Sequence, residues 1–86
     1  MDEHLSTQQV GWVIGHSPGT VRDRIQAGEI DATRIVDGYR IPKAEVLRLA
    51  RERIEAEAGR KLSTRDLERL IDELLATNAA TLAGAS

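Results

Sequence analysis

Apolar residues recur with the period of an α-helix in four segments of the chain. In the first segment, Ser6 and Gln9 stand three residues apart, which is the spacing of a capping box at a helix start. Leu5 and Val10 flank this box in the positions of a hydrophobic staple. The apolar face of the helix consists of Val10, Val13 and Ile14. Gly15 is a typical residue at a helix end, so we expect the helix to stop there.

A second helix is expected directly after this stop. Ser17 is placed as its N-cap and Pro18 as its first residue, where the missing N–H of proline does no harm. Val21 and Ile25 lie one turn apart and supply the apolar face, and Gly28 is the expected end. Two helices of roughly eight to ten residues joined by a short turn are typical of a helix-turn-helix unit.

The period then changes to that of a β-hairpin. Residues 33–36 and 39–41 predict two short strands on either side of Asp37-Gly38, a dipeptide typical of tight hairpin turns. Arg34 lies on the first strand and Arg40 on the second, and we expect them at opposite ends of the ribbon. Such a ribbon could lie along a phosphate backbone or probe the minor groove of DNA.

Two further helices complete the pattern. Pro42 is expected to open a helix that runs to about Ala58 and ends at Gly59. Ser63, with Asp66 three residues further on, predicts the cap of the last helix. The apolar stripe of that helix consists of Leu67, Leu70, Ile71, Leu74 and Leu75.

Together these elements predict a mainly α fold with a small β-hairpin, arranged as a winged helix-turn-helix with C-terminal helices. We expect residues 5–58 to form this domain and residues 59–77 an amphipathic helix packed on the domain or on a partner. Residues 78–86 are expected to be a flexible tail, and His4 to lie in a flexible N-terminus. Trp12 points away from the apolar face of the first helix, which favours a protein-interface role unless a later helix covers it.

Composition narrows the function further. The chain has 86 residues and a net charge of −2, which argues against a polycation that coats nucleic acid. Its first residues are acidic and polar, unlike a secretory signal, and no apolar run reaches the roughly 18–20 residues of a membrane helix. We therefore expect a cytoplasmic protein with no membrane partner.

No pattern in the chain predicts catalysis. There is no Cys, which excludes disulfides and thiolate chemistry, and the two histidines, His4 and His16, lack metal-ligand spacing. The glycines follow neither a phosphate-loop nor a dinucleotide-binding pattern, and no Ser stands in a nucleophile elbow. We expect no catalytic residue, no metal and no cofactor.

A nucleic-acid role fits better, because the second helix of a helix-turn-helix unit enters the major groove. With Val21 and Ile25 inward, Thr20 and Asp23 point outward, and Arg22 and Arg24 lie on the flanks. The candidate DNA-binding residues are Ser17, Thr20, Arg22, Asp23, Arg24, Arg34 and Arg40. The alternative is that Arg22 and Arg24 merely pair with neighbouring acids such as Asp23.

Residues 5–55 resemble the excisionase-type winged helix-turn-helix domains, which are related to the MerR DNA-binding domain. The motifs that carry the resemblance are LSTQQV at the start, SPGTVR entering the second helix, GEIDATR leading into the hairpin and YRIP closing it. The resemblance implies that Thr20, Arg22, Arg34 and Arg40 contact DNA. Many relatives have basic residues in place of Gly19 and Asp23, and an aromatic in place of Arg24.

The resemblance further implies a phage or prophage excisionase in a bacterial host cell. Such a protein binds adjacent sites near an attachment site, bends the DNA and directs an integrase or other recombinase toward excision. Four acids beside the four arginines predict weak binding by one copy, and therefore self-association on DNA. The alternatives are a small MerR-like transcription regulator, although 86 residues leave little room for an effector module, or a protein-binding helical adaptor.

Overall fold

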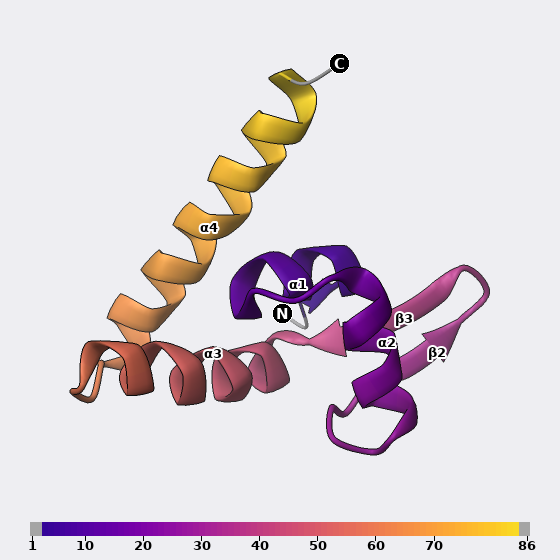
Figure 1. Ribbon diagram of the computed structural model, residues 1–86, viewed down its shortest axis with the longest axis horizontal. Coiled ribbons are helices and arrows are strands. Elements are labelled where there is room, and N and C mark those ends of the chain that lie inside the picture. The colour runs from indigo at the N-terminus through magenta and orange to yellow at the C-terminus, as the bar shows by residue number, and fades with distance from the viewer. Residues whose placement is uncertain (1–2, 85–86) are drawn as a thin grey trace.

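A computed structural model of the protein describes residues 3–84 and shows a mostly helical fold with a three-stranded antiparallel sheet (Figure 1). The predicted mainly α fold with a small β-hairpin is confirmed at this level. In chain order the elements are β1 (His4–Leu5), α1 (Thr7–Ile14), α2 (Pro18–Gln26), β2 (Thr33–Ile35), β3 (Gly38–Pro42), α3 (Lys43–Ala58) and α4 (Thr64–Gly84).

The capping box predicted for the first helix is present. The backbone N–H of Ser6 donates to Gln9 Oε1 at 2.9 Å, and the backbone N–H of Gln9 donates to Ser6 Oγ at 3.2 Å. At the other end Gly15 has φ 74°, a left-handed conformation that glycine adopts without strain. The two ends of α1 are therefore where the sequence places them.

The junction between α1 and α2 is tight. Only residues 15–17 separate the two helices, and the backbone N–H of His16 donates to the Gly11 carbonyl at 3.0 Å. A Cβ built on Gly11 would overlap the His16 carbonyl oxygen. Glycine at position 11 thus allows the chain to turn back directly against α1.

Helix α2 begins as predicted, with Ser17 as N-cap and Pro18 as the first residue. The backbone N–H of Thr20 donates to Ser17 Oγ at 3.2 Å, which satisfies one of the free N–H groups at the helix start. The helix ends at Gln26, slightly before the expected Gly28, which has φ 82° in the following turn.

The sheet contains a strand that the sequence pattern did not reveal. His4 pairs with Pro42 and Leu5 pairs with Ile41, so His4 lies in β1 and not in a flexible terminus. Leu5 is buried in the core, which fixes this strand in place. The sheet order is β1-β3-β2, with β3 in the middle.

The hairpin between β2 and β3 differs from the expected Asp37-Gly38 turn. Ile35 pairs with Gly38, so the two-residue loop is Val36-Asp37 and Gly38 already belongs to β3. Neither loop residue has a positive φ, whereas Gly38 has φ 142°. The glycine therefore accommodates the return of the chain one position later than the sequence suggested.

Helix α4 continues well beyond its predicted end. Residues 78–84, expected as part of a flexible tail, form its last turns, and residues 85–86 lie outside the described residues. Asn78 Nδ2 donates to the Leu74 carbonyl at 2.7 Å, and Thr81 Oγ1 donates to the Thr77 carbonyl at 2.9 Å. The alanines in this stretch are also strong helix formers, so no residue breaks the helix before its end.

The core joins residues from all four helices and two strands. Most of the leucine stripe of α4 faces this core, because Leu67 and Ile71 are buried and Leu75 packs against it. The buried apolar side chains are Leu5, Val10, Val13, Ile14, Val21, Ile30, Ile41, Val46, Leu49, Ala50, Leu67 and Ile71. In Figure 1 the C-terminal turns of α4 stand clear of the other elements at the top, and the β2–β3 hairpin projects to the right.

The contact at Gly11 predicts a large effect of a single methyl group. Gly11→Ala should destabilise the protein by about 1–3 kcal/mol, because the added Cβ overlaps backbone that cannot move without shifting α2. Urea denaturation measures the change. Gly19→Ala, where the nearest atoms lie 3.9 Å from the added Cβ, is the matched control and should be neutral or stabilising. Equal stability of the two variants would contradict the tight junction.

Candidate nucleic-acid interface

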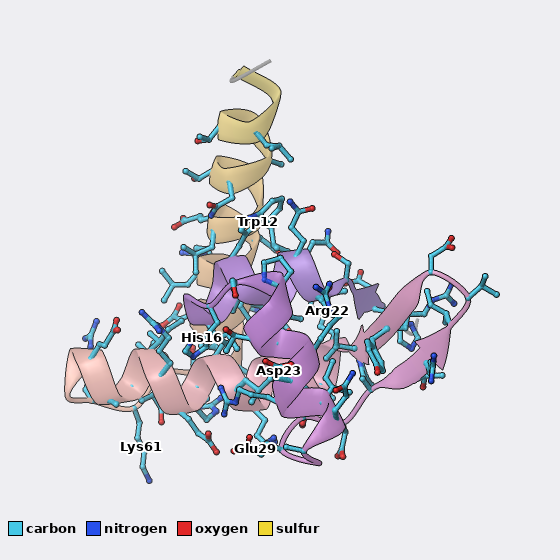
Figure 2. All side chains as sticks on the ribbon, turned by 45° about the vertical axis from the view of Figure 1, so that its right-hand side comes forward. Trp12, His16, Arg22, Asp23, Glu29 and Lys61 are labelled. Atoms are coloured by element: carbon cyan, nitrogen blue, oxygen red, sulfur yellow. The ribbon has the colours of Figure 1, made fainter. Side chains whose placement is uncertain are left out.

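The exposed side of α2 carries most of the residues predicted to contact DNA. Thr20, Arg22 and Asp23 are exposed, and Arg24 is half-buried. Figure 2 shows Arg22 on the side of α2 nearer the β2–β3 hairpin and His16 on the other side, towards α3. The helix therefore presents a polar face with one arginine on each flank, as its apolar period predicts.

The N-terminus of α2 combines two hydroxyl groups with a guanidinium. Ser17 Oγ lies 3.0 Å from Thr20 Oγ1, so the two hydroxyls share a hydrogen bond. Arg22 Nη2 lies 3.9 Å from the position that a Cβ on Gly19 would take, which places the guanidinium beside the first turn. Since the helix start also carries a partial positive charge, this end of α2 favours an anionic group.

The four arginines predicted to contact DNA have no partner in the part of the chain that the structure describes. Within residues 3–84, no ion pair or side-chain hydrogen bond involves Arg22, Arg24, Arg34 or Arg40. The alternative in which Arg22 and Arg24 pair with Asp23 is therefore not observed. The ion pairs found among the described residues all use cations of α3: Lys43–Glu3, Arg48–Glu45, Arg48–Glu52, Arg51–Glu55 and Arg53–Glu57.

Arg34 and Arg40 lie at neighbouring positions along the hairpin but on its opposite faces. Arg34 pairs with Tyr39, and Arg40 pairs with Thr33 in the adjacent position. The expectation of opposite ends is thus wrong. Because successive residues of a strand point to opposite faces, the two arginines project from the two sides of the ribbon.

A buried carboxylate positions the segment that leads into the hairpin. Glu45, only 8% exposed, accepts the backbone N–H of Asp31 at 2.8 Å. Arg48 donates to both of its oxygens, at 2.8 and 2.7 Å, and also to the Glu29 carbonyl at 3.3 Å. The start of α3 therefore holds the connection between α2 and β2.

The surroundings of Glu45 favour its charged form. The hydrogen bond from Arg48 holds the pKa of Glu45 below its ordinary value, with a further contribution from the backbone N–H of Asp31, and these outweigh the opposing effect of burial. Sequence reasoning missed this residue. Its spacing from Arg48 is that of an ordinary surface pair on a helix, and only the packing of the Asp31 loop buries it.

Trp12 takes an intermediate position. Its side chain is half-buried, whereas the helical period of α1 places it on the solvent side. It is not part of the core cluster or among the residues packed against that cluster. Trp12 is therefore neither a core residue nor a fully free anchor.

Two hollows mark the surface of the described part of the chain. One lies where the end of α1 meets α2 and α3, and the other lies between α3 and α4, lined by Ile54, Leu70, Glu73, Leu74 and Thr77. Among residues 3–84, no group of three His, Asp or Glu side chains is placed to hold a metal ion. No described helix is both long and apolar enough to cross a bilayer.

The network around Glu45 predicts pH-dependent stability. Glu45→Gln keeps the shape of the side chain but removes its charge. At pH 7 it should lower the free energy of unfolding by about 1–3 kcal/mol, a range that allows for the screening of the half-exposed Arg48 by solvent. Because the pKa of Glu45 is lowered in the folded state, its contribution is present above about pH 4.5 and is lost as the pH falls below that value. Urea denaturation at several pH values measures the difference.

Glu52→Gln is the matched control, since Glu52 pairs with the same arginine but is exposed. That variant should change stability by less than about 0.5 kcal/mol. If the difference in free energy of unfolding between the wild type and Glu45→Gln stayed constant from pH 7 to pH 3, the charged pair would be contradicted.

Comparisons with protein-family models, with curated proteins and with solved structures find no match to this chain. The function is therefore inferred from the charges and the geometry of α2 and the β2–β3 hairpin.

Proposed function

We propose that the protein binds double-stranded DNA as a winged helix-turn-helix, with α2 in the major groove and the β2–β3 hairpin as the wing. One observation carries this proposal. Four exposed or half-exposed arginines on two adjacent elements have no acidic partner in the described chain, while α3 neutralises its own cations with carboxylates. Unpaired guanidinium groups are well suited to phosphate and guanine.

The dimensions of α2 suit this role. Its nine residues span about 14 Å, and a helix with side chains is about 10–12 Å wide, comparable to the roughly 12 Å major groove. Arg22 can donate to a guanine or a phosphate from the flank, and Thr20 to a phosphate near the helix start. Asp23, on the outward face, can accept from the amino group of cytosine, a contact that would contribute specificity.

The finer proposal is an architectural protein of the excisionase type. It is supported by the resemblance of residues 5–55 and by the balance of charges around α2 and the hairpin. Arg22, Arg24, Arg34 and Arg40 are matched in number by Asp23, Glu29, Asp31 and Asp37. A single copy should bind weakly, so several copies on adjacent sites, in contact with one another and with a recombinase, would give useful affinity.

A solitary MerR-like regulator is the alternative within the DNA-binding class. Mapping of protected DNA beside a candidate attachment site, with and without the cognate integrase, separates the two. An excisionase protects several adjacent sites and changes which DNA positions the integrase protects. A regulator protects one site and leaves the integrase pattern unchanged.

A protein-binding role is the second candidate, favoured by the apolar hollow between α3 and α4 and by Leu82, which is 56% exposed. A partner retained after nuclease treatment, together with no DNA retention, would support this role over DNA binding. Because Leu67 and Ile71 are buried within the protein, only the remaining face of α4 is free for such a partner.

Arg22 provides the direct test of DNA binding. Arg22→Ala should weaken specific binding by about 1–3 kcal/mol if the side chain contacts a base. If it contacts only phosphate, all sequences should weaken together and the salt slope should fall by about one. Titration of labelled duplexes at several salt concentrations measures both quantities. Arg69→Ala removes the same charge from α4 and should leave binding unchanged. Equal affinities of wild type and Arg22→Ala, with both folded, would refute the interface.

Trp12 tests the formation of an array. Trp12→Ala should leave binding to one isolated site nearly intact and reduce cooperative filling of adjacent sites, because aromatic side chains are common anchors at protein interfaces. Since Trp12 is half-buried, the melting temperature is measured alongside, and Trp12→Leu preserves apolar packing while removing the ring. Equal loss at single and multiple sites would assign Trp12 to the fold.

A further inference from the structure

A cleft lies beside α2 on the flank away from the hairpin. Its volume is about 250 Å³, several times the roughly 30 Å³ that one water molecule occupies in the liquid. The end of α1, the turn before α2, α2 itself and α3 all contribute to its wall. The lining residues are Ile14, His16, Arg24, Leu49, Glu52 and Arg53.

The cations in this cleft differ in how they are held. Arg53 donates to the Ile14 carbonyl at the end of α1 and pairs with Glu57 at 3.2 Å. Its guanidinium lies flat against Gly15, where an added Cβ would come within 2.7 Å of Nη1. Arg53 is therefore fixed in orientation, which lowers the entropy cost of using its remaining donors for a ligand.

Arg24 supplies a guanidinium charge that no described acidic side chain neutralises in an ion pair. It forms no ion pair or side-chain hydrogen bond with the described residues, although it is half-buried. The one acid of the lining, Glu52, is paired with Arg48 at 3.2 Å. The imidazole of His16 adds a further hydrogen-bond donor. The cleft thus offers donors from α2, from α3 and from the turn between α1 and α2, and its lining also includes the apolar Ile14 and Leu49.

We propose that this cleft binds a phosphate group, and that in the DNA complex it receives the backbone of the strand opposite to the one at the hairpin. This proposal rests on the proposed function. A helix in the major groove has a phosphate backbone on each side. Arg22 lies on the side of α2 near the hairpin, and His16 lies on the other side (Figure 2), so each flank of α2 faces one strand.

Phosphate matches the donors better than a cation or an apolar ligand would. Arg24 can give paired N–H donors to phosphate oxygens, and Arg53 can add the donors that Ile14 and Glu57 leave free. Charge-assisted hydrogen bonds of this kind are about twice as strong as neutral ones. Glu52 and Glu57 reduce the net positive charge, so free phosphate should bind only in the millimolar range. Binding becomes useful when DNA presents the phosphate at the cleft.

The first arm of the test uses inorganic phosphate without DNA. We expect NMR signals of the His16 ring and of the Arg24 and Arg53 Nε–H groups to shift saturably with phosphate, but not with chloride at equal ionic strength. Arg24→Gln should abolish the shifts at His16 and Arg53. Arg69→Gln, on α4, is the matched control and should leave them unchanged. Shifts that do not saturate, or that persist in Arg24→Gln, would overturn the proposed phosphate site.

The second arm uses duplex DNA. Arg24→Gln should lower the slope of log affinity against log salt by about one, equally for all sequences. DNA should also shift the Arg53 Nε–H signal in the wild type. Arg53→Lys keeps the charge but loses the paired N–H donors of the guanidinium, and should weaken DNA binding. Its melting temperature is also measured, because Arg53 donates a hydrogen bond to the end of α1.

The two arms separate the cleft from the proposed function. Saturable phosphate shifts that depend on Arg24, in a protein that binds no DNA, would support the cleft and refute the DNA-binding role. If the protein binds DNA, but inorganic phosphate causes no NMR shifts and DNA leaves the Arg53 Nε–H signal unshifted, the DNA-binding role is retained and the phosphate site in the cleft is refuted.

Discussion

The packing of α1 is the constraint on which the other elements depend. This helix of eight residues contacts α2, α3, α4 and β3, so its direction determines where each of them lies. Close approach is possible because Gly11 has no side chain to hold α2 away. Helix α2 is then covered on one side only, through Val21 and Ile25, and its polar side remains exposed next to the hairpin.

The distribution of ion pairs explains how a weakly acidic chain can present arginines that have no acidic partner among the described residues. Along α3, arginines and glutamates stand three or four residues apart and neutralise one another, and Glu55 also accepts the backbone N–H of Leu62 at 2.8 Å. Most of these carboxylates are compensated by the cations of α3 itself, although Glu52 also lines the cleft beside Arg24. Helix α3, with four cations and four carboxylates, adds nothing to the net charge of −2, whereas α4 has two arginines and four acids. The local field at α2 depends on Arg22, Arg24 and their immediate acidic neighbours.

Much of the fold could be predicted because its signals are local. The capping box at Ser6, the Ser17-Pro18 start of α2 and the left-handed ends at Gly15 and Gly59 are decided by a few adjacent residues. The features that were missed depend on long-range packing. Strand β1 exists because Leu5 enters the core beside Ile41, and Glu45 is buried because the loop at Asp31 folds over it. The cleft likewise needs Arg24 and Arg53, 29 positions apart, and no periodicity within one helix relates them.

The faces of the hairpin limit how the candidate interface can be used. Tyr39 packs against the core, and its partner Arg34 shares that face of the ribbon, whereas Arg40 and Thr33 share the other. The two arginines therefore cannot reach one phosphate together. If the ribbon lay flat on a backbone, one of them would point into solvent. In the proposed DNA complex, an edge-on approach of the ribbon to a groove would bring Arg34 to one wall and Arg40 to the other. This orientation would leave Arg22 and Arg24 to contact the strands that flank α2.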